Sequence, residues 1–261
     1  MVNKGNQAMK MKLNKSGPIS ILEMKDPKES YRICMDPLPD LPARGLIIGK
    51  SQRAGKTNLL ANLIMLHYAG KWKPENIFIF CKTANSDYKW RQMLERLEIP
   101  KENIITGFSE SRAEDVYQTI VDDYNDHEAD ETAPEHYLVI FDDVAFDGSL
   151  KKTSNGAIDQ LYCNGRHYLI SVFVNAQKYT QVDTTCRVNA TFCIVFDTTN
   201  KEIKLIAEDH NKLESQKAFR EMFLEATDEP HSFLLINYNK SRYGNDLYQN
   251  ASFGNLFGKS T

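Results

Sequence analysis

The sequence has no apolar run of the roughly 18 to 20 residues that a membrane-spanning helix needs. Its first residues, MVNKGNQAMKMKLNKSG, contain lysines but not the apolar stretch of a secretion signal. Cysteine is also scarce: the five cysteines are odd in number, widely spaced and mostly inside apolar runs, which favours reduced, buried thiols over a disulfide framework or a zinc site. We therefore expect no membrane span, no secretion and a cytosolic environment.

A strong charge of either sign is missing too. The 32 basic and 35 acidic residues leave a formal net charge of -3, which argues against a chain that coats nucleic acid with its whole surface. A local basic patch, or a pore lined by a few lysines, is compatible with this average. Internal repeats and low-complexity blocks are absent, and 261 residues of ordinary composition predict one sizeable α/β domain.

Composition divides the chain into three parts. Residues 1–44 are rich in Lys, Pro and Asp, which predicts a partly mobile N-terminal arm ending in an extended segment that leads into the domain. Regular structure is expected over 45–239. Residues 240–261 are rich in Asn, Gly and Ser and are expected to form a loosely held tail.

Within the middle part, apolar segments of strand length alternate with helical periodicity. The expected strands are GLIIG, NIFIFC, YLVIFDD, ISVFVNAQ and TFCIVFD, and the helices between them are expected over 56–69, 87–98 and about 150–164. A further amphipathic helix, NKLESQKAFREMFLEAT, precedes a late strand, HSFLLINY, expected at the sheet edge. This alternation predicts an α/β fold with a mostly parallel central sheet and helices on both faces.

The stretch LIIGKSQRAGKT has the end of a Walker A phosphate-binding loop. Such a loop follows a buried strand and opens a helix, so that backbone N–H groups hold phosphates, a lysine reaches the β- and γ-phosphates, and a hydroxyl ligates Mg²⁺. A chance GKT in a turn is the alternative. The residues assigned to the nucleotide site are Gly49, Lys50, Ser51, Gln52, Arg53, Ala54, Gly55, Lys56, Thr57 and Asn58.

The start of this loop departs from the standard pattern. Gly49 and Gly55 enclose five residues instead of four, so that Lys50 stands where the first glycine belongs. The loop is therefore either one residue longer or tolerates lysine there. Lys50 is interpreted as a solvated side chain at the mouth of the loop.

Acidic residues end another buried strand, HYLVIFDDV. Asp142 is expected to hold Mg²⁺ through water, with the Thr57 hydroxyl as a ligand, and Asp143 to act as general base. Gln177, at the end of ISVFVNAQ, would lie beside Asp143 and sense the γ-phosphate. A DD turn and a glutamine cap are the alternatives for these residues taken alone.

Two arginines are candidates for a finger that stabilises phosphate charge in a neighbouring subunit. Arg166 immediately precedes the strand of Gln177, and Arg187 lies in TTCRVNATF. A surface salt bridge that caps the preceding helix is the alternative for Arg166.

The order GKT, IFDDV, GRHYLISVFVNAQ and CRVNATFCIVF, over 44–196, resembles the genome-packaging ATPases of the FtsK-HerA superfamily, in the branch of large eukaryotic DNA viruses, virophages and related elements. The resemblance implies a RecA-like P-loop core with ATP and Mg²⁺ as cofactors. It also implies a homo-oligomeric ring of five or six subunits that moves double-stranded DNA into a preformed capsid. By position, Lys56 and Thr57 would bind phosphate and Mg²⁺, Asp142 and Asp143 would form the Walker B pair, and Gln177 and Arg166 would be sensor and finger.

The resemblance further implies contact with capsid vertex proteins, and a location in the host cytoplasm, at the assembly site or in the virion. Two other functions stay open on the residues alone: a P-loop phosphotransferase of small molecules and a nucleotide-binding switch without motor activity. The sequence contains no Asn-Lys-x-Asp motif for guanine and no Leu-Ser-Gly-Gly-Gln motif of ABC transporters. Neither a GTPase nor a transporter subunit is therefore favoured.

Overall fold

The computed structural model describes residues 13–14, 21–22, 27–50, 54–144, 156–238 and 247–252, and the chain forms two units, 1–32 and 33–261. In the first unit, β1 (Leu13–Asn14) pairs antiparallel with β2 (Ile21–Leu22), and a 3-10 helix, η1 (Pro27–Tyr31), follows. The division at residue 32 differs from the domain start expected at 45. Residues 33–43 fold onto the larger unit because Leu38, Leu41 and Ala43 are buried in its core.

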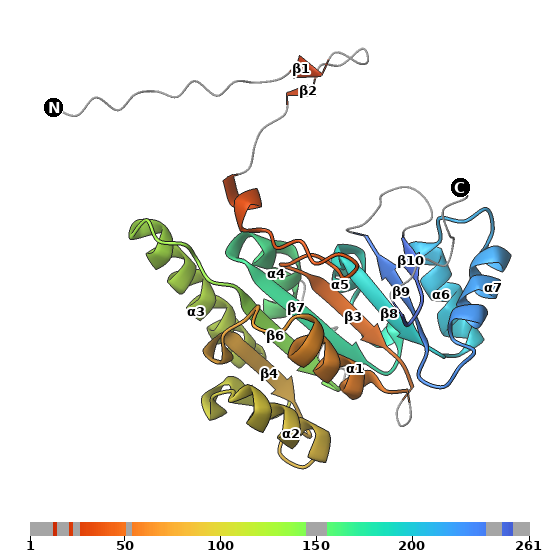
Figure 1. The fold of residues 1–261 in the computed structure, drawn as a ribbon, viewed down its shortest axis with the longest axis horizontal. Helices are drawn as coiled ribbons and strands as arrows, with labels where there is room; N and C mark the ends of the chain where they lie inside the picture. The colour runs from red at the N-terminus through yellow and green to blue at the C-terminus, as the bar shows by residue number, and fades with distance from the viewer. Residues whose placement is uncertain are drawn as a thin grey trace. The chain divides into compact units, whose positions relative to one another are not determined.

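The described part of the larger unit is built on an eight-stranded sheet (Figure 1). Its strands are β3 (Arg44–Ile48), β4 (Ile77–Cys81), β5 (Ile104–Ile105), β6 (Tyr137–Asp142), β7 (Ile170–Ala176), β8 (Phe192–Phe196), β9 (Phe233–Asn237) and β10 (Tyr248–Gln249). Their order is β10-β9-β8-β3-β7-β6-β4-β5, and the strands from β8 to β5 are parallel. The predicted α/β fold with a mostly parallel sheet is confirmed.

Helices connect the strands. They are α1 (Lys56–Asn62), α2 (Tyr88–Leu97), α3 (Glu110–Ala129), α4 (Ala157–Asn164), α5 (Thr184–Asn189), α6 (Asn200–His210) and α7 (Gln216–Ala226). A π-helical turn, η2 (Leu63–His67), extends α1, and 3-10 turns lie at η3 (Pro74–Asn76), η4 (Lys101–Asn103), η7 (Gly165–Tyr168) and η8 (Tyr179–Gln181). Side chains of Asp87, Ser109, Thr199 and Ser215 accept backbone hydrogen bonds at the starts of α2, α3, α6 and α7, which explains where these helices begin.

The helices cover both faces of the sheet, each over its own apolar core. Along β3, Leu46 and Ile48 face the core under α3 to α7, whereas Ile47 faces the core under α1 and α2. This alternation follows from the two-residue period of a strand. Most of the isoleucine, valine and phenylalanine side chains of the parallel strands are buried on one face or the other. Packing on both faces therefore fixes the positions of the strand ends.

The carboxyl ends of β3, β6 and β7 meet at one edge of the sheet, called here the carboxyl edge. Ile48 pairs with Ala176, and Asp142 pairs with Asn175. The chain leaves β3 at this edge and turns into α1. The opposite, amino edge carries the first residues of the same strands, including Arg44.

The predicted late strand is β9, but it does not form the outermost strand, because β10 pairs with it antiparallel. Leu247 and Tyr248 are buried. The described residues 247–252 thus belong to the domain, beyond the boundary expected at 239. The backbone of β10 gives β9 the pairing partner that an exposed strand edge would otherwise lack.

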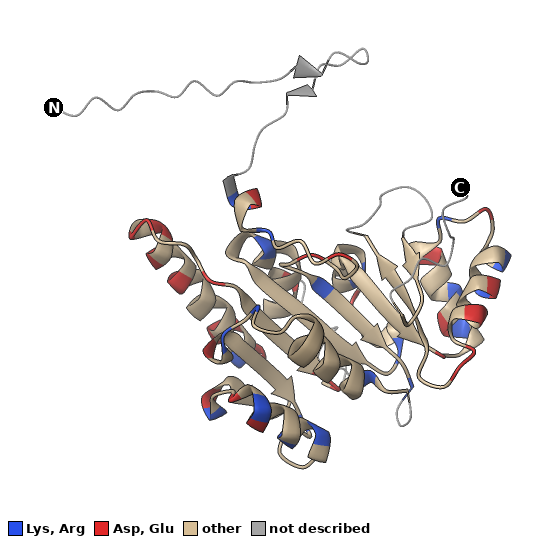
Figure 2. Ribbon diagram, viewed as in Figure 1, with Lys and Arg blue, Asp and Glu red and all other residues tan. Residues whose placement is uncertain are grey.

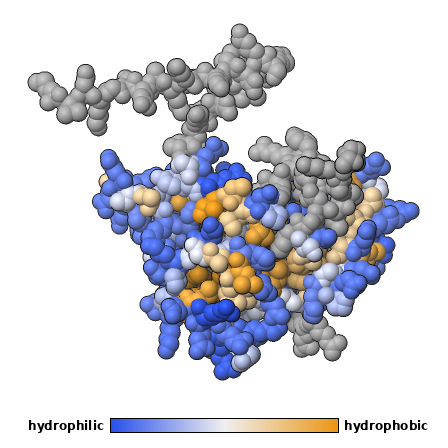
Figure 3. All heavy atoms as spheres, in the orientation of Figure 1, coloured by the Kyte–Doolittle hydropathy of each residue, from blue (hydrophilic) through white to orange (hydrophobic). Residues whose placement is uncertain are grey.

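Charged residues lie mainly on helices and connecting segments (Figure 2). The face in Figure 3 shows apolar residues near its centre, bordered by hydrophilic ones. Among the described residues, the large exposed apolar side chains include Leu66 on η2 and Tyr88 on α2. None of the helices in the described ranges combines the length and apolar character that crossing a membrane requires.

Candidate active site

The loop after β3 lies at the carboxyl edge, between a buried strand and α1. Gly55 has φ 97°, a left-handed conformation that favours glycine. Gly49 is crowded, because a Cβ there would meet the Phe196 Cβ at 3.0 Å and the Ala54 Cβ at 3.1 Å. The first glycine is therefore needed in its early position. The assigned residues Ser51, Gln52 and Arg53 lie outside the described residues.

Lys56 is the best-defined residue of this loop. Its Nζ donates to the backbone oxygens of Gly49, at 2.7 Å, and of Lys50, at 3.2 Å. Burial lowers the pKa of this ammonium, while the nearby Asp143 and Asp142 raise it. The two carboxylates favour the charged form of Lys56, and a buried ammonium whose hydrogen bonds among the described residues go to two carbonyls is suited to bind an anion.

The Lys50 side chain, expected to be solvated, is exposed and also forms an ion pair. Its Nζ lies 2.8 Å from Oδ2 of Asp197, just after β8. Both side chains are more than half exposed, at 51% and 62%, so the ion pair adds little stability. It does direct Lys50 away from the strands β6 and β7 and toward β8.

Asp142 is buried, with 3% of its surface exposed, and both of its oxygens have protein donors. Asn175 Nδ2 donates to Oδ1 at 2.8 Å, and Trp90 Nε1 donates to Oδ2 at 2.6 Å. Cys81 Sγ lies 3.6 Å from Oδ2. Burial raises the pKa of the carboxyl group, and the hydrogen bonds from Asn175 and Trp90 lower it. Sequence reasoning missed all three donors.

Asp143 follows in a left-handed conformation, with φ 51°. Its N–H donates to the Asn175 oxygen at 3.3 Å, and its Oδ1 accepts from Gln177 Nε2 at 3.4 Å. The structure thus brings Gln177 and Asp143 together as expected. Backbone strain of this kind is frequent at functional sites, where the surrounding contacts hold it.

The residues expected at the metal are a hydroxyl, Thr57, and a carboxylate, Asp142. Both are oxygen ligands of the kind that Mg²⁺ prefers. In the described ranges, no three His, Cys, Asp or Glu side chains gather closely enough to hold a metal ion by themselves. The donor set therefore fits an ion that takes its remaining ligands from a bound phosphate and water, as Mg²⁺ commonly does.

Arg166 lies in η7, directly before β7, and therefore at the amino edge. Its Nε lies 3.3 Å from Nε2 of His167. Burial lowers the pKa of the neighbouring Arg44, and the charge of Arg166 lowers it further. The length of β7, seven residues, separates Arg166 from Gln177 by roughly 20 Å. Arg166 does not reach the nucleotide site of its own chain.

Arg187, the other candidate, is held by its own chain. Its guanidinium donates to Asp209 Oδ2 at 3.1 Å and to Thr184 Oγ1 at 3.0 Å, and it lies 4.9 Å from the centre of the Tyr179 ring. Its side chain is only 15% exposed. These contacts favour a structural role.

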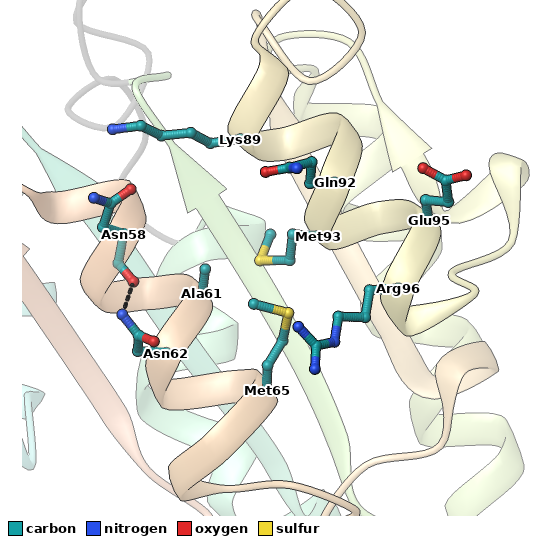
Figure 4. Close-up of a pocket in the computed structure, with 9 residues that line it drawn as sticks. All are labelled: Asn58, Ala61, Asn62, Met65, Lys89, Gln92, Met93, Glu95 and Arg96. Carbon is teal, nitrogen blue, oxygen red and sulfur yellow. Dashed lines mark hydrogen bonds between the residues drawn. The ribbon is translucent and has the colours of Figure 1, made fainter.

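A groove of about 450 Å³ runs between α1 and α2 (Figure 4). Met65 and Met93 point toward one another across it, and Lys89, Gln92 and Arg96 lie along its α2 side (Figure 4). Asn58, assigned to the nucleotide site, lines this groove. Its backbone oxygen accepts from Asn62 Nδ2 at 2.9 Å.

A second cleft, of about 510 Å³, lies on the β8 side of the loop. It is bordered by Lys50 and Ala54, by Phe196 and Asp197 at the end of β8, and by the turn 227–232 between α7 and β9. His231, with φ 68°, lies against the loop: its Nδ1 is 3.5 Å from the Ala54 oxygen. A Cβ on Gly55 would come within 3.3 Å of the same nitrogen.

The poxvirus A32 protein family matches residues 32–239, which span the sheet, the loop and the carboxyl edge. The chain belongs to this family. The match confirms the predicted relationship to the packaging-ATPase branch of large eukaryotic DNA viruses. No curated protein sequence matches this A32-family chain.

Solved structures with the same fold include the genome packaging NTPase B204 from Sulfolobus turreted icosahedral virus 2 in complex with AMPPCP. It is 14% identical with a TM-score of 0.55, covering 80% of this chain and 97% of that one. B204, the DNA-packaging ATPase from Sulfolobus turreted icosahedral virus, is 15% identical with a TM-score of 0.52, at 80% and 97% coverage. EssC (ATPases 2 and 3) from Geobacillus thermodenitrificans is 15% identical with a TM-score of 0.51, at 74% and 37%. These neighbours confirm the RecA-like fold of the A32-family chain.

Proposed function

We propose that this A32-family protein is an ATP-hydrolysing motor that moves double-stranded viral DNA into a preformed capsid. The observation that carries the proposal is the meeting of Lys56, Asp142 and Asp143 at one sheet edge, in a chain of this family. The B204 neighbours, a genome packaging NTPase solved with AMPPCP and a DNA-packaging ATPase, support the same activity.

Each residue of the site has a defined task in this proposal. Lys56 exchanges its two carbonyl partners for phosphate oxygens, and N–H groups at the start of α1 bind the same anion. Thr57 and Asp142 would hold Mg²⁺, which neutralises phosphate charge when bound. Asp143 accepts the proton of the attacking water, and Gln177, hydrogen-bonded to Asp143, orients that water.

The strand order indicates how ATP lies on the loop. Asp143 and Gln177 follow β6 and β7, on one side of β3, which supports placing the γ-phosphate there. The cleft beside β8 lies on the other side and carries Asp197, Asp228 and Glu229 against Lys50 and His231. An acidic cleft repels phosphate and suits the uncharged adenosine, whose ribose hydroxyls can donate to carboxylates. We therefore place the adenosine in this cleft.

The position of Arg166 fits a homo-oligomeric ring. Because it lies at the amino edge, it can serve only the nucleotide of another subunit. We propose that it acts in this way in a ring of five or six subunits around double-stranded DNA. Capsid vertex proteins are the further partners, at an assembly site in the host cytoplasm or in the virion.

The phosphotransferase alternative needs a mobile lid with several arginines, for which the sequence offers only the weak candidate 82–103. That segment forms α2, whose Trp90 is buried and donates to Asp142. Such a helix is part of the core of the site. The observation favours the motor over the phosphotransferase.

The decisive test is the ATPase rate with and without duplex DNA, combined with native mass at the same protein concentration. We expect an oligomer whose rate rises with DNA, and loss of hydrolysis in Lys56→Ala. A DNA-insensitive monomer that phosphorylates a metabolite would overturn the proposal.

A further inference from the structure

The carboxylate of Asp142 is held by a residue outside the sequence motifs. Trp90, in the first turn of α2, is 1% exposed and donates its indole N–H to Asp142 Oδ2 at 2.6 Å. The indole N–H can only donate a hydrogen bond, so its partner must be an acceptor such as a carboxylate. A tryptophan used only for packing would not need its nitrogen at that distance.

The contact fixes the direction of the carboxylate. Asn175 holds Oδ1 from β7, and Trp90 holds Oδ2 from α2, so two elements on different sides determine the plane of the group. A hydrogen bond to a charged acceptor contributes about 1.5–3 kcal/mol, more than a neutral one. Without the Trp90 donor, the remaining partner of Oδ2 is the weak Sγ–H of Cys81, 3.6 Å away.

We propose that Trp90 is a positioning residue that orients Asp142 for Mg²⁺-bound nucleotide, and that it ties the position of α2 to occupancy of this site. The proposal rests on the proposed function, in which Asp142 faces the metal. Trp90 touches neither substrate nor metal in it; it acts through Asp142.

The opposite side of α2 shows what a coupling between this helix and the site at Asp142 would affect. Lys89, Gln92 and Arg96 line the groove toward α1 (Figure 4). Trp90 is buried and donates to Asp142 at the end of β6. One short helix therefore borders the groove on one side and contacts the site carboxylate on the other. A change at Asp142 that moves Trp90 also moves the wall of the groove.

Trp90→Phe removes the donor and keeps a smaller aromatic ring. The matched control is Trp72→Phe, because Trp72 is also buried and its Nε1 has no hydrogen-bond partner among the described residues. Binding of ATPγS to the full chain is measured by calorimetry with and without Mg²⁺. We expect Trp90→Phe to lose about ten-fold of the Mg²⁺-dependent gain in affinity, the equivalent of about 1.4 kcal/mol. Its affinity without Mg²⁺ should equal that of wild type, and Trp72→Phe should keep the whole gain.

Fluorescence gives a second readout, which remains available if Trp90→Phe does not fold. The chain has two tryptophans, so Trp72→Phe leaves Trp90 as the single emitter. We expect its emission to change when Mg²⁺ is added to the ATPγS complex, since the indole N–H senses the charge on Asp142.

Two results would overturn the positioning role: a full Mg²⁺-dependent gain in Trp90→Phe, or an unchanged Trp90 emission while Mg²⁺ tightens ATPγS binding. Failure of the wild-type chain to bind ATPγS at all would refute the proposed function, and the role of Trp90 with it. The two failures are thereby distinguished.

Discussion

His210, at the end of α6, should make the stability of the protein depend on pH in a measurable way. It is 3% exposed, its Nε2 lies 2.7 Å from the Tyr179 hydroxyl, and its Nδ1 is hydrogen-bonded to the Tyr238 hydroxyl. Burial lowers the pKa of His210 from 6.5 to about 4; Asp209 opposes this change, and the charges of Arg187 and Lys212 assist it.

The sign and size of the effect follow from linkage. Between the two pKa values the unfolded chain binds a proton at His210 and the native protein does not, so unfolding is favoured as pH falls. The stability is therefore intact above pH 6.5 and is lost toward the folded-state pKa near 4. With those values, the loss from His210 alone is about 2 kcal/mol at pH 5 and about 3 kcal/mol at pH 4.

The assay is urea unfolding of wild type and His210→Gln at pH 7, 6, 5 and 4. The variant is expected to be less stable at pH 7, because its amide replaces the fitted imidazole, but to lose less stability as the pH falls. The exposed His67→Gln should follow the wild-type slope. If His210→Gln and wild type lose the same free energy of unfolding between pH 7 and pH 4, burial of neutral His210 is not the cause of the loss at low pH.

Three further predictions concern the site. Asp143→Asn should bind ATP but turn it over about 100-fold more slowly or worse; a normal rate in steady-state hydrolysis would remove Asp143 from the chemistry. Arg166→Ala should bind nucleotide yet lose hydrolysis by about 1000-fold, and mixing it with Asp143→Asn subunits should restore some activity. If the mixture stays inactive, either Arg187 is the arginine finger or no finger acts between subunits. Asp197→Asn and His231→Ala should each weaken ATP binding by about ten-fold and leave inorganic triphosphate binding unchanged; equal losses for both ligands would exclude adenosine from the cleft.

Much of the fold was predictable because its strands are nearly continuous apolar runs and its turns carry polar residues. The meeting of Asp143 with Gln177 follows from the same reasoning, since parallel strands end at one edge. Three helices, α3, α5 and α6, were missed. In α3, Ala113, Val116 and Ile120 have helical spacing, so the signal was present, although charged residues surround it.

The contacts that sequence reasoning could not supply join segments far apart in the chain. Trp90 and Asp142 are separated by 52 residues, and Lys50 and Asp197 by 147. No periodicity or motif encodes such pairs, because tertiary packing alone brings them together. The edge on which Arg166 lies was likewise undecided until the end of α4 and the start of β7 were known.

One strand of the sheet has a consequence for a ring of subunits. Gln177 follows the carboxyl end of β7, Arg166 lies in the 3-10 turn that precedes its amino end, and every residue from Ile170 to Ala176 is buried. Buried central strands deform little, so the two ends move as one piece. In a ring, β7 would transmit motion between two nucleotide sites. A tilt of the strand caused by the subunit's own ATP at the carboxyl end would displace Arg166 at the nucleotide of the next subunit. Sequential ATP hydrolysis around the ring would then need no flexible segment between neighbouring sites.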